Sequence, residues 1–175
     1  MAICYHCKEK KSGFSQFPSK YVGQKICFSC VKKLGLDYLL TTEESNKARE
    51  KNHYQSFEQL IQIVNERRPI YDKMDAAFQK TREFKCGNYN TIEIDESSEL
   101  ICIVKNSNRF YFSYSDFIRI ENVDNTENFL PGQLRMSNFF IYYKLFGSNN
   151  VFITDNENSD LFSFFSSIQS HPEQE

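Results

Sequence analysis

Two Cys-x2-Cys pairs near the N-terminus constrain the fold of this chain more than any other feature of its sequence. The first pair is Cys4 and Cys7, the second is Cys27 and Cys30, and nineteen residues lie between the pairs. Four thiolates surround Zn²⁺ tetrahedrally at about 2.3 Å, and each Cys-x2-Cys turn supplies two adjacent corners. The spacing therefore predicts a zinc site with these four ligands. Two redox dithiols or two disulfides are the alternative interpretation, and His6 is a further candidate that could replace one cysteine.

Zinc held by four protein thiolates has no open position for water or substrate, so the predicted metal is structural and not catalytic. The second pair opens a short helix that Gly35 is expected to end, and the N–H groups at the helix N-terminus would stabilise thiolate on Cys27 and Cys30. A knuckle, a hairpin and a helix in this order predict a treble-clef-like finger over residues 1–42. Such a short segment has too little core to fold alone, so metal binding would supply much of its folding free energy.

The formal charge of −2 hides a strong asymmetry along the 175 residues. Residues 1–42 carry +5, residues 43–85 carry +1 and residues 86–175 carry −8, which sums to −2. A tail this acidic repels phosphate, so extensive wrapping of nucleic acid is disfavoured. The N-terminus has neither the basic region nor the apolar run of a signal peptide, and no stretch is long and apolar enough for a transmembrane helix. These features predict a cytoplasmic protein with reduced cysteines that does not bind membranes.

Residues 43–85 are expected to form a helical connector between two domains. Thr41 and Glu44 have the spacing of a capping box. The apolar residues of an amphipathic helix over about residues 43–66 recur at i, i+3, i+4 and i+7, as Phe57, Leu60, Ile61 and Val64. Pro69 lacks an N–H group and would clash with the preceding turn, so it is expected to break the helix and start a second one over roughly residues 70–81.

From Asn90 the pattern changes to short runs of β-branched and aromatic residues separated by turn-forming residues. The runs are 91–94, 100–104, 109–114, 117–121, 139–145 and 151–154. Strands at this spacing indicate a mostly antiparallel sandwich or barrel over residues 86–175. A short helix after Ser159 and Asp160 is expected to end the domain, with Leu161, Phe164, Phe165 and Ile168 packed inward. The fold class is therefore α+β.

The sequence resembles a group of bacterial and phage proteins that begin with a four-cysteine treble-clef-like domain and continue into a small pleckstrin-homology-like (PH-like) β domain. The resemblance rests on residues 4–7 with 26–35, and on residues 92–96 with 110–121. It implies a PH-like fold for residues 86–175 and no catalytic residues. The sequence departs from many such proteins over residues 122–134, which are polar and irregular.

Other candidate residues have plainer explanations. Cys86 and Cys102 have no partner at ligand spacing and are expected to be small buried hydrophobes. Asp116 follows Ser115 as a general base might follow a nucleophile, but Ser-Asp between strands is ordinarily turn chemistry. The aromatic residues of the strands, such as Phe140 and Tyr142, could stack nucleic-acid bases, although most are expected in the core, and an exposed aromatic patch would mark a partner site.

No glycine-rich phosphate loop, activated nucleophile or open metal site is present in the sequence, so an enzyme is not expected. The leading hypothesis is a zinc-stabilised regulatory protein that binds another protein, and self-association is left open. The alternative is a nucleic-acid-binding finger with an acidic β domain that regulates it or mimics a nucleic-acid surface. The basic residues that would contact phosphate in this alternative are Lys8, Lys10, Lys11, Lys32 and Lys33.

Overall fold

The computed structural model describes residues 1–15, 22–38, 56–87, 89–106, 108–123, 136–156 and 159–169. The chain divides into two compact units, Met1–Lys73 (unit 1) and Met74–Glu175 (unit 2). The division falls within one helix, α5, which spans Phe57–Ala77. The three-part division at residues 42 and 85 stays a prediction.

Unit 1 begins with short elements that could not persist alone. Its strands are β1 (Ala2–Ile3), β2 (Lys10–Lys11), β3 (Phe14–Ser15) and β4 (Ile26–Cys27), followed by the helix α2 (Phe28–Lys33). β1 pairs with β2 and β3 pairs with β4, each antiparallel. Two-residue strands and a six-residue helix are too short to be stable in isolation. Something other than their own hydrogen bonds must hold them.

The end of α2 matches the prediction made for Gly35. This residue has φ 69°, the left-handed conformation that glycine adopts without steric cost. Its N–H donates to the Lys32 carbonyl at 3.2 Å, and the Leu36 N–H donates to the Val31 carbonyl at 2.9 Å. These two bonds make a Schellman motif, which satisfies the last carbonyls of α2 and directs the buried Leu36 back into the core of unit 1.

Helix α5 is one continuous helix, so the expected break at Pro69 is wrong. Pro69 lies inside it. A proline in a helix interior costs about 3 kcal/mol because one hydrogen bond is lost and the ring crowds the preceding turn. The helix buries Leu60 and Val64 before the proline and Tyr71 after it, and this burial offsets the cost. The predicted first helix falls partly on residues 43–55, which lie outside the described residues.

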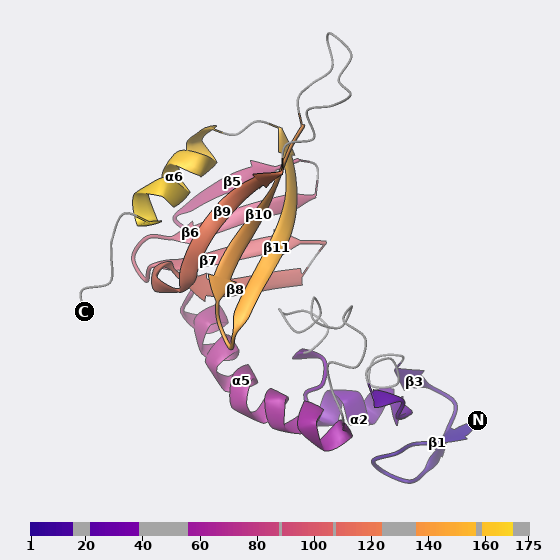
Figure 1. Cartoon of the computed structure of the whole chain (residues 1–175). Coiled ribbons are helices and arrows are strands. Elements are labelled where there is room, and N and C mark those ends of the chain that lie inside the picture. The colour runs from indigo at the N-terminus through magenta and orange to yellow at the C-terminus, as the bar shows by residue number, and fades with distance from the viewer. Residues whose placement is uncertain are drawn as a thin grey trace. The chain divides into compact units, whose positions relative to one another are not determined.

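Unit 2 consists of two antiparallel sheets (Figure 1). The four-stranded sheet has the order β5-β6-β7-β8, and the three-stranded sheet has the order β11-β10-β9. The strands are β5 (Arg82–Cys86), β6 (Asn90–Asp95), β7 (Leu100–Lys105), β8 (Asn108–Ser113), β9 (Phe117–Val123), β10 (Met136–Lys144) and β11 (Ser148–Asn156). All six predicted strands are present, and β5 is an additional strand that the sequence pattern did not indicate.

The core of unit 2 lies between the two sheets. Alternate residues of each strand point inward, for example Ile92 and Ile94 from β6 and Phe139, Ile141 and Tyr143 from β10. In the part of unit 2 that is described, the sheets do not close into a barrel. The chain is thus α+β with antiparallel sheets, as expected.

A C-terminal helix, α6 (Ser159–Gln169), covers one end of this core. Leu161, Phe164 and Phe165 are buried in the core cluster, which confirms the predicted helix and its inward face. The Phe164 ring centroid lies 5.7 Å from that of Phe84, and the Phe165 centroid lies 4.8 Å from that of Phe117. The helix therefore touches both sheets. None of the helices in the described part of the chain has the length and hydrophobicity needed to span a membrane.

Candidate metal centre

The four cysteines of the two Cys-x2-Cys pairs come together at the junction of the short elements of unit 1. Cys4 follows β1, and Cys7 lies in the turn toward β2. Cys27 ends β4, and Cys30 lies in the first turn of α2. The knuckle turn is closed by a hydrogen bond from the Lys8 N–H to the Cys4 carbonyl, at 2.9 Å. Each pair thus presents two sulfurs from one turn, as the spacing predicts.

The positions of the sulfurs suit a single metal ion. The four Sγ atoms all lie within 4.8 Å of one another, and none of the four cysteines is in a disulfide. Thiolates around tetrahedral zinc lie about 3.8 Å apart, as follows from a metal–sulfur distance of about 2.3 Å. Small side-chain adjustments would therefore close this cluster on a metal ion. The donors are all sulfur, which suits Zn²⁺ better than a cation that prefers oxygen ligands.

Hydrogen bonds favour thiolate at two of the four positions. Burial raises the pKa of Cys4, but backbone N–H groups, that of Cys27 foremost, outweigh burial and lower it overall. The N–H of Cys27 lies 3.4 Å from the Cys4 Sγ. The pKa of Cys27 is lowered to about 6, chiefly by the Ser29 hydroxyl, whose Oγ lies 3.2 Å from the Cys27 Sγ, and then by the Cys30 N–H. Cys27 thus fits the predicted stabilisation of thiolate at the start of a helix.

At Cys30 burial and the neighbouring thiols act in the opposite direction and favour the thiol over the thiolate. Burial and hydrogen bonds with the neighbouring thiols raise the pKa of Cys30 to about 12. A buried thiolate surrounded by other sulfurs is costly unless a cation offsets its charge. A divalent metal at the centre of the cluster would supply that charge, because a coordinating thiol is deprotonated outright.

The other candidate ligands lie outside the cluster. The His6 ring packs against Phe57 of α5, with 6.4 Å between the ring centroids, and His6 is not a member of the metal-binding group. Cys86 and Cys102 are fully buried in unit 2, and burial raises the pKa of Cys102 to about 12. Both cysteines are small buried residues of the β strands, as expected from the sequence.

The lysines proposed to contact phosphate come from two separate elements of unit 1. Lys10 and Lys11 form β2, and Lys32 and Lys33 form the last turn of α2. Of these four, all but Lys11 are exposed, and Lys11 forms an ion pair with Glu9 at 2.5 Å. The remaining lysine, Lys8, is also exposed, and its Nζ lies 4.4 Å from the centroid of the Tyr5 ring.

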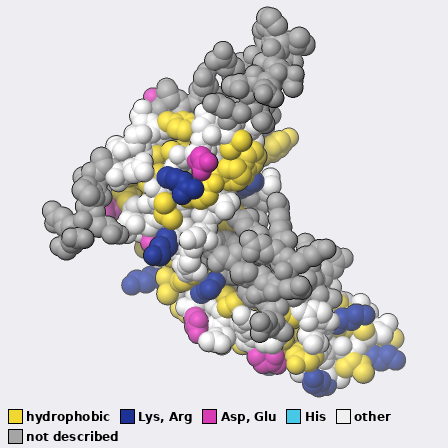
Figure 2. Space-filling model, viewed as in Figure 1, with side chains coloured by type: hydrophobic (Ala, Val, Ile, Leu, Met, Phe, Trp, Pro, Cys, Tyr) yellow, Lys and Arg dark blue, Asp and Glu magenta, His cyan; other side chains and the backbone are white. Residues whose placement is uncertain are grey.

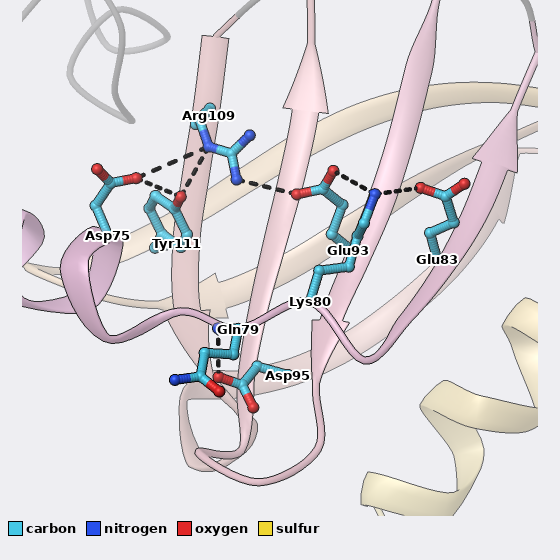
Figure 3. A network of polar contacts seen from close by, with 8 residues as sticks. All are labelled: Asp75, Gln79, Lys80, Glu83, Glu93, Asp95, Arg109 and Tyr111. Carbon is cyan, nitrogen blue, oxygen red and sulfur yellow. Dashed lines mark hydrogen bonds and ion pairs between the residues drawn. The ribbon is translucent and has the colours of Figure 1, made fainter.

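Unit 2 contains a polar network on the outer face of the four-stranded sheet, which no pattern in the sequence indicates (Figure 3). Tyr111 donates to Asp75 at 2.5 Å and accepts a hydrogen bond from the Nε of Arg109 at 2.7 Å. Arg109 also donates to Glu93 at 3.0 Å, and Lys80 lies 3.6 Å from the same carboxylate. The charges alternate in sign across the sheet, so the network ties the segment around residues 75–80 to strands β6 and β8.

Replacing Tyr111 by phenylalanine is expected to weaken this network. The hydroxyl is nearly buried, and its removal takes the acceptor from Arg109 and the donor from Asp75. Arg109 and Asp75 are partly exposed and can recruit water, so the expected loss in the free energy of unfolding is about 1–2 kcal/mol. Urea unfolding followed by circular dichroism measures it. Tyr89→Phe is the matched control, because Tyr89 is 81 % exposed and should leave stability unchanged.

A second polar group missed by the sequence analysis is the buried carboxylate of Asp95, at the end of β6. It accepts hydrogen bonds from the Gln79 N–H at 2.8 Å, from the N–H groups of Ser97 and Ser98 at 3.1 Å, and from the Ser97 hydroxyl at 2.6 Å. Burial alone would raise the pKa of Asp95, but these donors lower it to about 2. The carboxylate therefore organises the turn between β6 and β7 and anchors the segment that leads into β5.

Asp116 takes part in turn chemistry, as the sequence indicates. Its Oδ2 accepts hydrogen bonds from the Ser113 N–H at 2.9 Å and from the Ser113 hydroxyl at 2.6 Å. This arrangement is a capping box around the single turn of 3-10 helix Tyr114–Asp116, which joins the two sheets of unit 2.

Comparison of the chain with protein-family models, with curated proteins and with solved structures gave no match.

Proposed function

We propose that this chain is a non-enzymatic protein whose N-terminal finger is stabilised by zinc and binds another protein. The four thiols converge on one position, and a zinc ion bound there would have all its coordination sites occupied by protein. Such a metal fixes structure and has no free site for a substrate. A reducing compartment such as the cytoplasm keeps the thiols available to it.

The observation that carries the proposal is the placement of exposed apolar side chains beside the metal ligands. Ile3 is 65 % exposed and directly precedes Cys4, and Phe28 is 63 % exposed and directly follows Cys27. The Phe28 ring lies over the backbone of Gly13, where an added Cβ would come within 3.1 Å of it. Metal binding would fix the two neighbouring cysteines and with them the two apolar side chains. A rigid apolar side chain pays little entropy on binding, which favours a protein partner.

The proposal is tested by capture from the native cell with the immobilised full chain, followed by binding measurements with the purified partner. The wild type and Tyr89→Ser, a control on unit 2, should retain the same partner. The double variant Ile3→Ser, Phe28→Ser should bind the partner at least tenfold more weakly, which corresponds to about 1.4 kcal/mol of binding free energy. Metal content equal to the wild type shows that the double variant is folded.

Removal of the metal with a chelator should abolish the same interaction. A partner that binds the double variant and the chelated protein as tightly as the wild type would show that the finger is not the binding surface. Deletion of residues 86–175 should also weaken binding if both domains contact the partner.

We also propose a specific fold for each of the two domains within the α+β class. We infer a treble-clef-like finger, supported by the order of knuckle, β3–β4 hairpin and helix α2 around the cysteines. We also infer a PH-like domain over residues 86–175, supported by two antiparallel sheets followed by a single C-terminal helix.

Nucleic-acid binding by the finger is the second candidate, and the exposure of Lys8, Lys10, Lys32 and Lys33 favours it. In this case the acidic unit 2 would regulate the finger or mimic a nucleic-acid surface. Affinity for DNA or RNA should fall steeply with salt, because bound cations are released from the phosphates. Neutralising Lys10, Lys11, Lys32 and Lys33 should flatten that dependence. Binding that is absent at low salt would exclude this candidate.

A further inference from the structure

The outward face of the three-stranded sheet in unit 2 carries three aromatic rings side by side. Phe139, Ile141 and Tyr143 of β10 are fully buried, so the alternation of the strand directs Phe140 and Tyr142 outward. Phe152 of β11 is the direct partner of Phe140 in the antiparallel register. We call Phe140, Tyr142 and Phe152 the aromatic face.

The rings of the aromatic face are in contact with one another and remain accessible. The Phe140 centroid lies 5.0 Å from that of Phe152 and 6.0 Å from that of Tyr142. Phe152 is 37 % exposed, and Phe140 and Tyr142 are partly exposed. Figure 2, which shows unit 2 with β9–β11 toward the viewer, has hydrophobic side chains gathered there around a basic and an acidic one. Single exposed apolar residues are common on protein surfaces, whereas contiguous apolar groups are typical of binding sites.

Cations border the aromatic face. Arg119 of β9 is the register partner of Tyr142, and its guanidinium carbon lies 3.9 Å from the centroid of the Tyr142 ring. The Lys105 Nζ lies 5.6 Å from the Phe152 ring and donates to the Phe152 carbonyl at 2.6 Å. Lys144 continues the outward row of β10 and is exposed.

One carboxylate opposes these three cations among the described residues of the face. Glu121 lies 3.3 Å from Arg119. The excess of cations is notable because residues 86–175 contain only five basic residues against thirteen acidic ones. Three of those five basic residues therefore border the aromatic face, and the net charge of the face is opposite to that of the unit that carries it.

We propose that the aromatic face binds an acidic segment of another protein that also carries apolar side chains. Aromatic residues and arginine are the residues most enriched at the energetic centres of protein interfaces. Carboxylates of the partner would meet Arg119, Lys105 and Lys144, while an apolar side chain packs on Phe140 and Phe152. A nucleic acid or an anionic membrane would bring a dense array of charge close to a strongly acidic unit, which disfavours both. The proposal does not depend on the finger surface around Ile3 and Phe28.

The test is a titration of the ¹⁵N-labelled, zinc-loaded full chain, followed by NMR. The probe is a short synthetic peptide of glutamates interspersed with leucine and phenylalanine, and the matched control peptide has lysine in place of each glutamate. The acidic peptide should shift the amides of Arg119, Glu121, Phe140, Tyr142 and Phe152, and the lysine peptide should not. Added salt should weaken the interaction because surface charges contribute to it.

Variants assign the binding to the face. Phe140→Ser and Arg119→Ser should each weaken binding of the acidic peptide about tenfold or more, equivalent to about 1.4 kcal/mol. Both side chains point outward, so the remaining amide signals should be unchanged in the absence of peptide. Tyr89→Ser on unit 2 and Phe28→Ser on unit 1 are controls that should bind the acidic peptide like the wild type. If Phe28→Ser weakens binding of the partner at the finger but not binding of the acidic peptide, the two surfaces act separately.

Several results would overturn the proposal. One is the absence of shifts at the amides of the face with millimolar acidic peptide. A second is equal binding of the lysine peptide. A third is a stronger response at the same amides to oligothymidylate or to phosphatidylserine vesicles, which would assign the face to another class of partner. The last is a wild-type dimer in sedimentation that Phe140→Ser converts to monomer, which would show that a second copy of the chain covers the face.

Discussion

Replacing Cys27 by serine is expected to remove the metal and to unfold most of unit 1 while unit 2 keeps its structure. The four sulfurs converge from elements that are only two to six residues long, so a metal ion held by them would be the strongest link between these elements. Structural zinc contributes about 10–16 kcal/mol of apparent binding free energy in small zinc-dependent folds at neutral pH. No other single contact described in unit 1 approaches this magnitude.

Elemental analysis and NMR measure the two parts of this expected result. Wild-type protein purified without chelator should contain one zinc per chain, and the Cys27→Ser protein should contain little. In the variant, amide signals of residues 1–15 and 22–38 should collapse toward random-coil positions, and those of strands β5–β11 should stay in place. Unit 2 has its own core between its sheets, which makes this separation possible.

The matched control is Cys102→Ser, which replaces a fully buried cysteine outside the cluster. Its metal content should equal that of the wild type. Wild-type protein without zinc, or equal loss of zinc in both variants, would contradict the site and return the cysteine pairs to the redox interpretation.

Replacing Asp95 by alanine should produce the largest loss of stability among the polar residues of unit 2. The carboxylate accepts four hydrogen bonds, from Gln79, Ser97 and Ser98, and its side chain is fully buried. A buried donor left without an acceptor costs about 1–3 kcal/mol. Because the turn can recruit water for some of these donors, we expect a total loss of about 3 kcal/mol in the free energy of unfolding.

The contribution of Asp95 should also depend on pH, in a direction that its pKa fixes. The folded-state pKa is about 2, below the ordinary value of 3.8, so the folded protein binds the proton more weakly than the unfolded chain. The stabilisation is therefore fully present above about pH 4, and it is lost as the pH falls through the window from about 4 to 2.

Urea unfolding across this window, read from the circular dichroism of unit 2, checks the sign. Asp95→Asn should remove the part of the pH dependence that Asp95 causes. Glu96→Gln, an exposed neighbour in the same turn, is the matched control and should leave stability nearly unchanged. A stability difference between the wild type and Asp95→Asn that stays constant between pH 5 and about pH 2 would contradict the proposed ionised state.

The features that could be predicted from sequence are those whose cause is local. The spacing of two cysteines within one turn is a local property, so the two Cys-x2-Cys pairs indicated the cluster of four thiols. Alternating β-branched and aromatic residues likewise indicated six of the seven strands of unit 2. Strand β5 was missed because its sequence is largely charged and only Phe84 and Cys86 point into the core, a pattern typical of an edge strand.

The features that could not be predicted depend on residues far apart in the chain. Tyr111 and Asp75 are 36 residues apart, and neither is unusual in its own stretch of sequence. The sequence marks Asp95 only as one of several turn-forming polar residues, because its bond to Gln79 comes from another segment. The continuity of α5 through Pro69 reflects burial on both sides of the proline, and that burial exists only once unit 1 has folded.

The pairing of the strands in unit 2 has a consequence for how fast this unit folds. Each strand pair in the described sheets joins strands that follow one another in sequence, from β5 to β8 and again from β9 to β11. Contacts between sequence neighbours close short loops, and chains dominated by them fold faster than β proteins whose sheets are crossed by long connections. Each sheet of unit 2 can therefore assemble by adding strands in the order of the sequence.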